Sequence, residues 1–126
     1  ALAFARLGVA VEAGEEMPGR IAEAMRAHPD LVGGCKRFDT VLLQETQGRV
    51  IAKVGAEGVH TVMVPDRGIG FAVKAEDGAL RAQQAAVVEV LRLLEVLPTL
   101  TERLAEYLHK PLRNTRGEVV GEVRLG

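Results

Sequence analysis

The segment Lys53-Val54-Gly55-Ala56-Glu57-Gly58 combines a lysine with glycines in an order that could do chemistry. Lys53 ends a run of strand-forming residues and a glycine-containing turn follows it, so its ammonium could point into a cleft. A glycine here lets a substrate approach the backbone closely, because it has no Cβ. A lysine in such a place can stabilise a carboxylate or change the proton affinity of a neighbouring group. Taken alone, the same pattern also fits a solvated lysine before a hairpin.

The run Arg37-Phe38-Asp39-Thr40 is a second candidate, and it follows a loop with two glycines. Asp39 is a suitable N-cap for a helix over residues 40–46 and could pair with Arg37. Arg37 could instead bind a carboxylate through the two donor groups of its guanidinium. The residues by themselves leave both interpretations open.

The histidines and the cysteine show weaker patterns. Cys35 has no second cysteine to pair with, and His28 lies seven residues before it, which is not a metal-ligand spacing. We therefore predict no metal site within this chain. His60 falls in a strand pattern, and we expect it on the surface or on a pocket wall.

The elements that must position these residues form an α+β pattern. Strand patterns over residues 49–54, 59–64 and 69–74 are joined by short turns, which predicts a three-stranded antiparallel meander. A terminal strand is expected around Val119 and Val123, and it could cover one sheet edge. Residues 29–36 are expected to form a loop. Helices are predicted over residues 1–13, 18–28, 40–46, 79–97 and 101–109.

Composition limits the function classes. The 126 residues, 48% hydrophobic and 26% charged, are typical of one globular domain, here residues 1–126. The net charge of −1, without a cluster of cations, argues against a nucleic-acid partner. No apolar run is long enough to cross a membrane. A single cysteine suggests a reducing compartment, so we expect a cytoplasmic protein. The sequence contains no serine, and this chain therefore cannot supply a serine nucleophile.

Several motifs in a fixed order resemble the asparaginase II family, and they cover essentially the whole chain. They are His28-Pro29-Asp30-Leu31-Val32-Gly33-Gly34, Arg37-Phe38-Asp39-Thr40, Ala52-Lys53-Val54-Gly55-Ala56-Glu57-Gly58-Val59, Gly68-Ile69-Gly70-Phe71-Ala72-Val73-Lys74, Glu76-Asp77-Gly78 and Arg116-Gly117-Glu118-Val119-Val120-Gly121-Glu122. That family is similar in fold to serine β-lactamases and glutaminases. The resemblance implies that helices pack on a sheet as in the C-terminal part of a β-lactamase-like fold.

The same resemblance implies hydrolysis of L-asparagine to L-aspartate and ammonia. It makes Lys53 the expected catalytic residue, because its strand resembles the Lys-(Ser/Thr)-Gly strand that lines the cleft of that fold. Arg37, Asp39, Gly55 and Glu57 are then expected to bind substrate or to shape the site. The family's Ser-x-x-Lys nucleophile and its zinc-associated Cys-Ser-Gly-Lys-His and Asp-Gly-Cys segments do not occur in this sequence.

We therefore expect the C-terminal portion of a longer amidohydrolase, inactive by itself and without a cofactor of its own. Zinc would belong to a complete enzyme with upstream ligands. The expected partners are a small amide substrate and the missing N-terminal half. The alternative is a non-catalytic binding or assembly module, a homodimer in which self-association covers the sheet edges. A second polypeptide carrying the nucleophile favours the enzyme, and a chain that folds alone favours the module.

Overall fold

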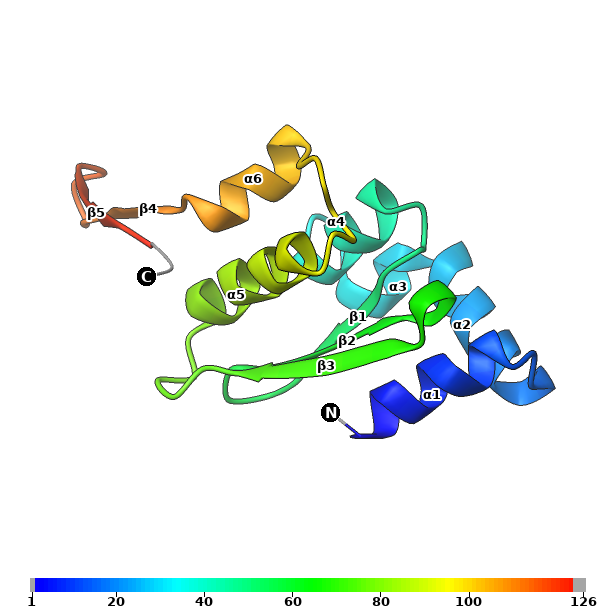
Figure 1. Ribbon diagram of the computed structural model, residues 1–126. Coiled ribbons are helices and arrows are strands. Elements are labelled where there is room, and N and C mark those ends of the chain that lie inside the picture. Colours follow the sequence, from blue (N-terminus) through cyan, green and yellow to red (C-terminus); the bar gives the residue numbers. More distant parts are fainter. Residues whose placement is uncertain (1, 124–126) are drawn as a thin grey trace.

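The computed structural model describes residues 2–123. Its elements form three layers, with a sheet in the middle and helices on both faces (Figure 1). Helices α1 and α2 lie on one face of the sheet, and α5, with α6 beyond it, lies on the other. No helix within residues 2–123 has the length and apolar character needed to cross a membrane. In chain order the elements are α1 (Leu2–Glu12), α2 (Glu16–Ala27), α3 (Pro29–Gly33), α4 (Phe38–Glu45), β1 (Ile51–Val54), β2 (Val59–Val64), the 3₁₀ turn η1 (Pro65–Arg67), β3 (Ile69–Lys74), α5 (Leu80–Leu93), α6 (Glu102–Leu108), β4 (Pro111–Arg113) and β5 (Val119–Glu122).

The central sheet has the strand order β1-β2-β3, and both pairs are antiparallel, so the predicted meander and the α+β class are confirmed. Lys53 lies opposite Thr61. The turn between β1 and β2 is closed by the Val59 N–H, which donates to the Ala56 carbonyl at 3.2 Å. Glu57 and Gly58 are the two central residues of this turn and both have positive φ, 56° and 74°. Positive φ at both central residues is characteristic of type I′ turns, whose twist matches that of the flanking strands.

The two faces of the sheet belong to two separate hydrophobic clusters. The larger cluster takes Ala52, Val62 and Val64 from the strands and packs them against α4, α5 and α6. The smaller cluster takes Ile51 and Met63, the neighbours of those residues, and packs them under α1 and α2. This alternation follows from the two-residue period of a strand. Each strand therefore stabilises both outer layers.

Small residues allow α1 to lie directly on the sheet. A Cβ added at Gly70 of β3 would be only 2.4 Å from the Cα of Ala5. A Cβ at Gly8 would be 3.4 Å from the Cβ of Met63. Any larger side chain at Gly70 would push the helix away, so this glycine fixes the distance between α1 and β3.

Several helix boundaries differ from the predicted ones: α2 begins two residues earlier, at Glu16, and three further differences concern α3, α4 and α5. Residues 29–33 form the short helix α3 instead of a loop, because Pro29 occupies the first helical position, where its missing N–H costs nothing. Helix α4 begins two residues earlier than predicted, after Arg37. Helix α5 ends at Leu93 rather than at 97, because Glu95 takes a positive φ of 55°. The chain then turns back so that the Val96 and Leu97 side chains enter the core.

The terminal strand does not cover an edge of the central sheet, so that prediction is wrong. β5 pairs instead with β4, which was not predicted because Pro111 resembled a helix terminator. The Asn114 side chain accepts hydrogen bonds from the N–H groups of Arg116 and Glu118 at 2.9 and 3.0 Å and so closes the hairpin locally. Figure 1 shows the hairpin beyond α6, away from the central sheet. Residue 1 of the predicted first helix lies outside the described residues.

Candidate active site

Asp39 is the buried centre of the site. It is the second residue of α4, and its side chain is 2% exposed. The helix is capped at Arg37 rather than at Asp39, so the predicted capping role is wrong. Of the two interpretations of Arg37, the one in which it pairs with Asp39 is not realised, because the carboxylate of Asp39 turns sideways toward the free edge of β1.

Three groups surround the Asp39 carboxylate. Oδ2 accepts a hydrogen bond from the backbone N–H of Val54 at 3.0 Å and lies 3.8 Å from Nζ of Lys53. Oδ1 lies 2.9 Å from Nε2 of His60. One carboxylate thus holds together the start of α4, the end of β1 and the beginning of β2.

His60 is a member of the site that sequence reasoning did not assign to it. Of the two predicted positions, the surface is wrong, because the side chain is only 1% exposed, whereas the pocket wall is confirmed, because His60 lines the small cavity beside Asp39. Its contact with Asp39 has the length of a hydrogen bond but not the alignment of one, so we describe it as electrostatic. Phe38 packs edge-on against the imidazole, with 5.2 Å between ring centroids, and Tyr107 packs on Phe38 at 4.7 Å. These two rings separate His60 from the surface near α6.

The surroundings of Asp39 favour its charged form. Burial alone raises the pKa of the carboxyl group, because a charge is poorly solvated inside a protein. The nearby His60, the Val54 N–H and the Lys53 ammonium together outweigh burial, so the pKa of Asp39 is lowered from its usual value. Asp39 is therefore an anion at neutral pH.

The backbone of Lys53 is held in place, whereas its ammonium group is accessible to solvent. Its backbone carbonyl accepts a hydrogen bond from Thr61 Oγ1 at 3.1 Å, and Nζ donates to the Val54 carbonyl at 3.2 Å. The side chain is 44% exposed. A positive charge held at a strand edge beside a buried anion can stabilise developing negative charge or donate a proton.

The other predicted site residues lie at different distances from this centre. Arg37 is exposed and lines a small cavity together with Asp39, Val54 and His60. Gly55 and Glu57 do not line it. Gly55 continues β1 through its N–H, which donates to the Val59 carbonyl at 2.8 Å, and Glu57 is an exposed turn residue. The structure thus brings Lys53, Asp39 and Arg37 to one place.

The full pattern of motifs has a match among known protein families. The chain matches the family model described as L-asparaginase II over residues 1–125. The chain belongs to the L-asparaginase II family. This confirms the resemblance found in the sequence motifs. A search of curated proteins gives no match.

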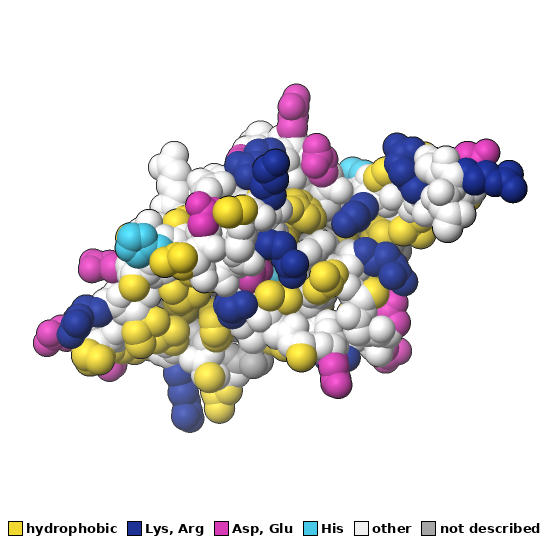
Figure 2. All heavy atoms as spheres, turned by 180° about the vertical axis from the view of Figure 1, so that it is seen from behind, with side chains coloured by type: hydrophobic (Ala, Val, Ile, Leu, Met, Phe, Trp, Pro, Cys, Tyr) yellow, Lys and Arg dark blue, Asp and Glu magenta, His cyan; other side chains and the backbone are white. Residues whose placement is uncertain are grey.

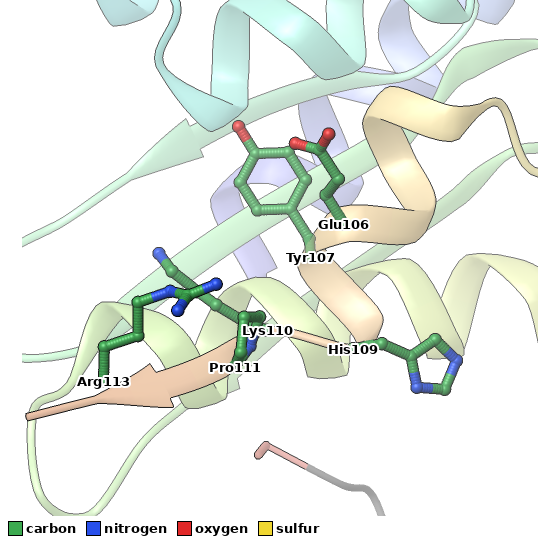
Figure 3. Close-up of a pocket in the computed structure, with 6 residues that line it drawn as sticks. All are labelled: Glu106, Tyr107, His109, Lys110, Pro111 and Arg113. Carbon is green, nitrogen blue, oxygen red and sulfur yellow. The ribbon is translucent and has the colours of Figure 1, made fainter. Parts of the chain in front are cut away.

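In this L-asparaginase II family member, a larger hollow lies between α6 and β4 (Figure 3), and Tyr107, which lines it, packs on Phe38. Its volume is about 620 Å³. Figure 3 shows Arg113 reaching toward the ring of Tyr107 and Lys110 extending beside Arg113, while His109 points away. Burial raises the pKa of Tyr107. The cavity next to Asp39 is much smaller, about 10 Å³, which is room for a single water molecule. No site role was predicted from the sequence for the residues that line the larger hollow.

Zinc, which the resemblance associates with a complete member of the L-asparaginase II family, does not fit the residues of this chain. Within residues 2–123 no three His, Cys, Asp or Glu side chains come together as an ion site. Cys35 is exposed and its thiol is free.

Proposed function

We propose that this chain contributes Lys53 to the active site of an asparaginase-type amidohydrolase, which converts L-asparagine to L-aspartate and ammonia. Membership of the L-asparaginase II family supports the reaction class. The observation that carries the role of Lys53 is its position: an accessible ammonium lies 3.8 Å from the buried anion of Asp39 at the open edge of β1.

Amide hydrolysis requires a nucleophile, a path for protons and a group that stabilises the oxyanion. Lys53 is suited to the last two tasks, because its ammonium carries both a charge and protons to donate. Asp39 offsets that charge from the buried side and keeps the ammonium near the strand edge. Since the chain has no serine, the nucleophile on this proposal belongs to a segment that is not part of this sequence.

We further propose that Arg37 and Gly55 serve the substrate. Arg37 is exposed next to Asp39, and its guanidinium is suited to a carboxylate such as that of an amino acid. Gly55 is exposed directly beyond β1, and a Cβ at this position would lie 3.3 Å from the Cβ of Val59, so glycine fits this turn beside Lys53. Glu57 is placed farther out, in the turn, and a site-shaping role for it stays a prediction. The exposed thiol of Cys35 is consistent with a cytoplasmic location.

A second candidate function, a self-associating module, is favoured by the exposed apolar side chains of α2 and α3. Leu31 is 84% exposed, and Met17 and Ile21 are also exposed. Figure 2 shows hydrophobic side chains gathered toward the end of the molecule where α1, α2 and α3 lie, with basic side chains across the middle. Apolar surface of this kind commonly marks an interface.

Native mass spectrometry of the protein purified without denaturant separates the two functions. A second polypeptide bound to this chain supports the amidohydrolase, and the complex is then assayed for ammonia release from L-asparagine. A homo-oligomer of this 13.5 kDa chain that releases no ammonia supports the module and contradicts the proposed reaction.

A further inference from the structure

His60 is a buried titratable residue to which the proposed reaction gives no task. Its side chain comes from β2 and is almost completely enclosed. Nε2 faces Oδ1 of Asp39 at 2.9 Å, and Nδ1 has no hydrogen-bond partner among the described residues. Burying an imidazole with an unpaired nitrogen costs free energy. The contact with Asp39 is the polar interaction of the His60 side chain that can offset this cost.

The two oxygens of Asp39 face different sides of the site. Oδ1 faces His60, whereas Oδ2 faces the Val54 N–H and the Lys53 ammonium. A carboxylate is planar, so fixing one oxygen fixes the direction of the other. His60 therefore acts on the same group that holds Lys53, although it does not itself contact Lys53.

The rest of the surroundings hold His60 in place. Phe38 packs edge-on against its ring, and Tyr107 packs on Phe38. The charged or titratable side chains around the Asp39 carboxylate are Lys53 from β1, His60 from β2, Tyr107 from α6 and, at the rim of the cavity, Arg37. Among these, His60 is the one that both packs directly against Phe38 and lies within 2.9 Å of a carboxylate oxygen.

We propose that His60 is a positioning residue for Lys53: it orients the Asp39 carboxylate so that Oδ2 stays on the Val54 N–H and on the Lys53 ammonium. The importance of His60 for catalysis rests on the proposed function of Lys53. The positioning role does not depend on that function, because the contacts of Asp39 with Val54 and Lys53 lie within this chain.

The test compares two amide variants in the isolated chain, His60→Gln and His60→Asn. The amide nitrogen of Gln can take the place of Nε2, whereas that of Asn takes the place of Nδ1 and does not reach Asp39. Both variants keep a polar side chain of similar kind at the buried position. They therefore differ mainly in whether Asp39 Oδ1 keeps its neighbour.

Hydrogen exchange of the Val54 amide is the first measurement, compared with amides inside the β1-β2-β3 ladder. In His60→Asn we expect Val54 to exchange about tenfold faster relative to the ladder, the factor that fits the loss of one hydrogen bond. His60→Gln should leave that ratio unchanged. Equal effects of the two variants on the ratio, or no effect of either, would overturn the proposal.

The NMR signal of the Lys53 Cε carbon is the second measurement, with Asp39→Asn as the reference for a lysine that has lost its anion. His60→Asn should move the signal toward the Asp39→Asn position, and His60→Gln should leave it at the original one. If the variants do not fold, the unsubstituted chain decides: a Val54 amide that exchanges as fast as in an unstructured peptide contradicts the proposal.

Neither measurement depends on enzyme activity, so the two proposals can fail separately. The expected Val54 and Lys53 changes, in a protein that releases no ammonia, support the positioning role and contradict only the proposed reaction. Ammonia release that depends on Lys53 but is equal in both His60 variants contradicts the positioning role alone.

Discussion

The Asp39 carboxylate accepts a hydrogen bond from the Val54 backbone N–H at 3.0 Å and so ties the beginning of α4 to the outer edge of β1. An edge strand leaves such N–H groups without partners from the sheet. Here a buried anion binds one of them and, with the same oxygen, faces Lys53. The bond thus fixes the strand end on which the proposed active-site lysine stands.

Removing the Asp39 side chain should destabilise the fold strongly. Asp39→Ala leaves the Val54 N–H and His60 without their buried partner, and we expect a loss of about 3–5 kcal/mol in the free energy of unfolding. Asp66→Ala is the matched control, because Asp66 is half-exposed and pairs with Arg49 at 2.9 Å. It should cost no more than about 1 kcal/mol. Urea denaturation measures both, and equal losses would contradict the central position of Asp39.

The contribution of Asp39 should depend on pH. Because the pKa of its carboxyl is lower in the folded chain than in the unfolded chain, the contribution is present above the unfolded pKa and is lost as the pH falls through the folded pKa. The stability difference between the unsubstituted chain and Asp39→Asn should therefore be largest above about pH 4 and shrink in more acidic solution. Denaturation at a series of pH values measures it. A difference that stays constant with pH would show that the charge of Asp39 has no such role.

Gly70→Ala should separate α1 from the sheet, because the new Cβ would meet the Ala5 backbone at 2.4 Å. Overpacking of this kind costs about 1–3 kcal/mol. Gly121→Ala is a matched substitution in β5, where the nearest atom, on Leu112, is 3.7 Å away. Thermal unfolding should show a clear loss for the first variant and almost none for the second. Similar melting temperatures for the two variants would mean that α1 is not held this closely.

Thr101→Ala should weaken the start of α6. The Thr101 hydroxyl accepts a hydrogen bond from the Leu104 N–H at 3.4 Å, and loss of such a cap costs about 1 kcal/mol. Thr101 also contributes to the lowered pKa of Glu45, so the same variant should raise that pKa. Thr99→Ala, at an exposed position, is the control. An NMR titration in which the Glu45 pKa is the same in both variants would contradict the contact between the Thr101 side chain and Glu45.

The sequence was sufficient to predict the parts of the fold that depend on neighbours in the chain. The meander follows from alternation along three short segments and from the turns between them. Lys53 could be placed at a strand end for the same reason. The hairpin of β4 and β5 could not, because Pro111 fits a helix terminator and the first residue of a strand equally well.

The centre of the site depends on contacts between distant residues, which local patterns do not show. Aspartate is a common residue at helix N-caps, which is why Asp39 was predicted to be one. In the structure its side chain instead accepts a hydrogen bond from the Val54 N–H. His60 has the local pattern of an ordinary strand residue, and its burial comes from distant residues: Phe38 packs on its ring, and α5 lies on the same part of β2. One signal was available in the sequence. His60 lies on the same face of β2 as the core residues Val62 and Val64, because residues two apart in a strand share a face.

The most direct test of the account is the rate of ammonia release from L-asparagine by the natively purified protein with Lys53→Ala. Lys74→Ala is its matched control, because Lys74 is the last residue of β3, as Lys53 is the last but one of β1, and both donate from Nζ to the carbonyl of the next residue. We predict that Lys53→Ala lowers kcat by about 10²–10⁴-fold. The free energy of unfolding should change by less than about 1 kcal/mol, since the side chain is half-exposed. Lys74→Ala should leave the rate unchanged. Ammonia release that survives Lys53→Ala, or that falls equally in both variants, would contradict the role of Lys53.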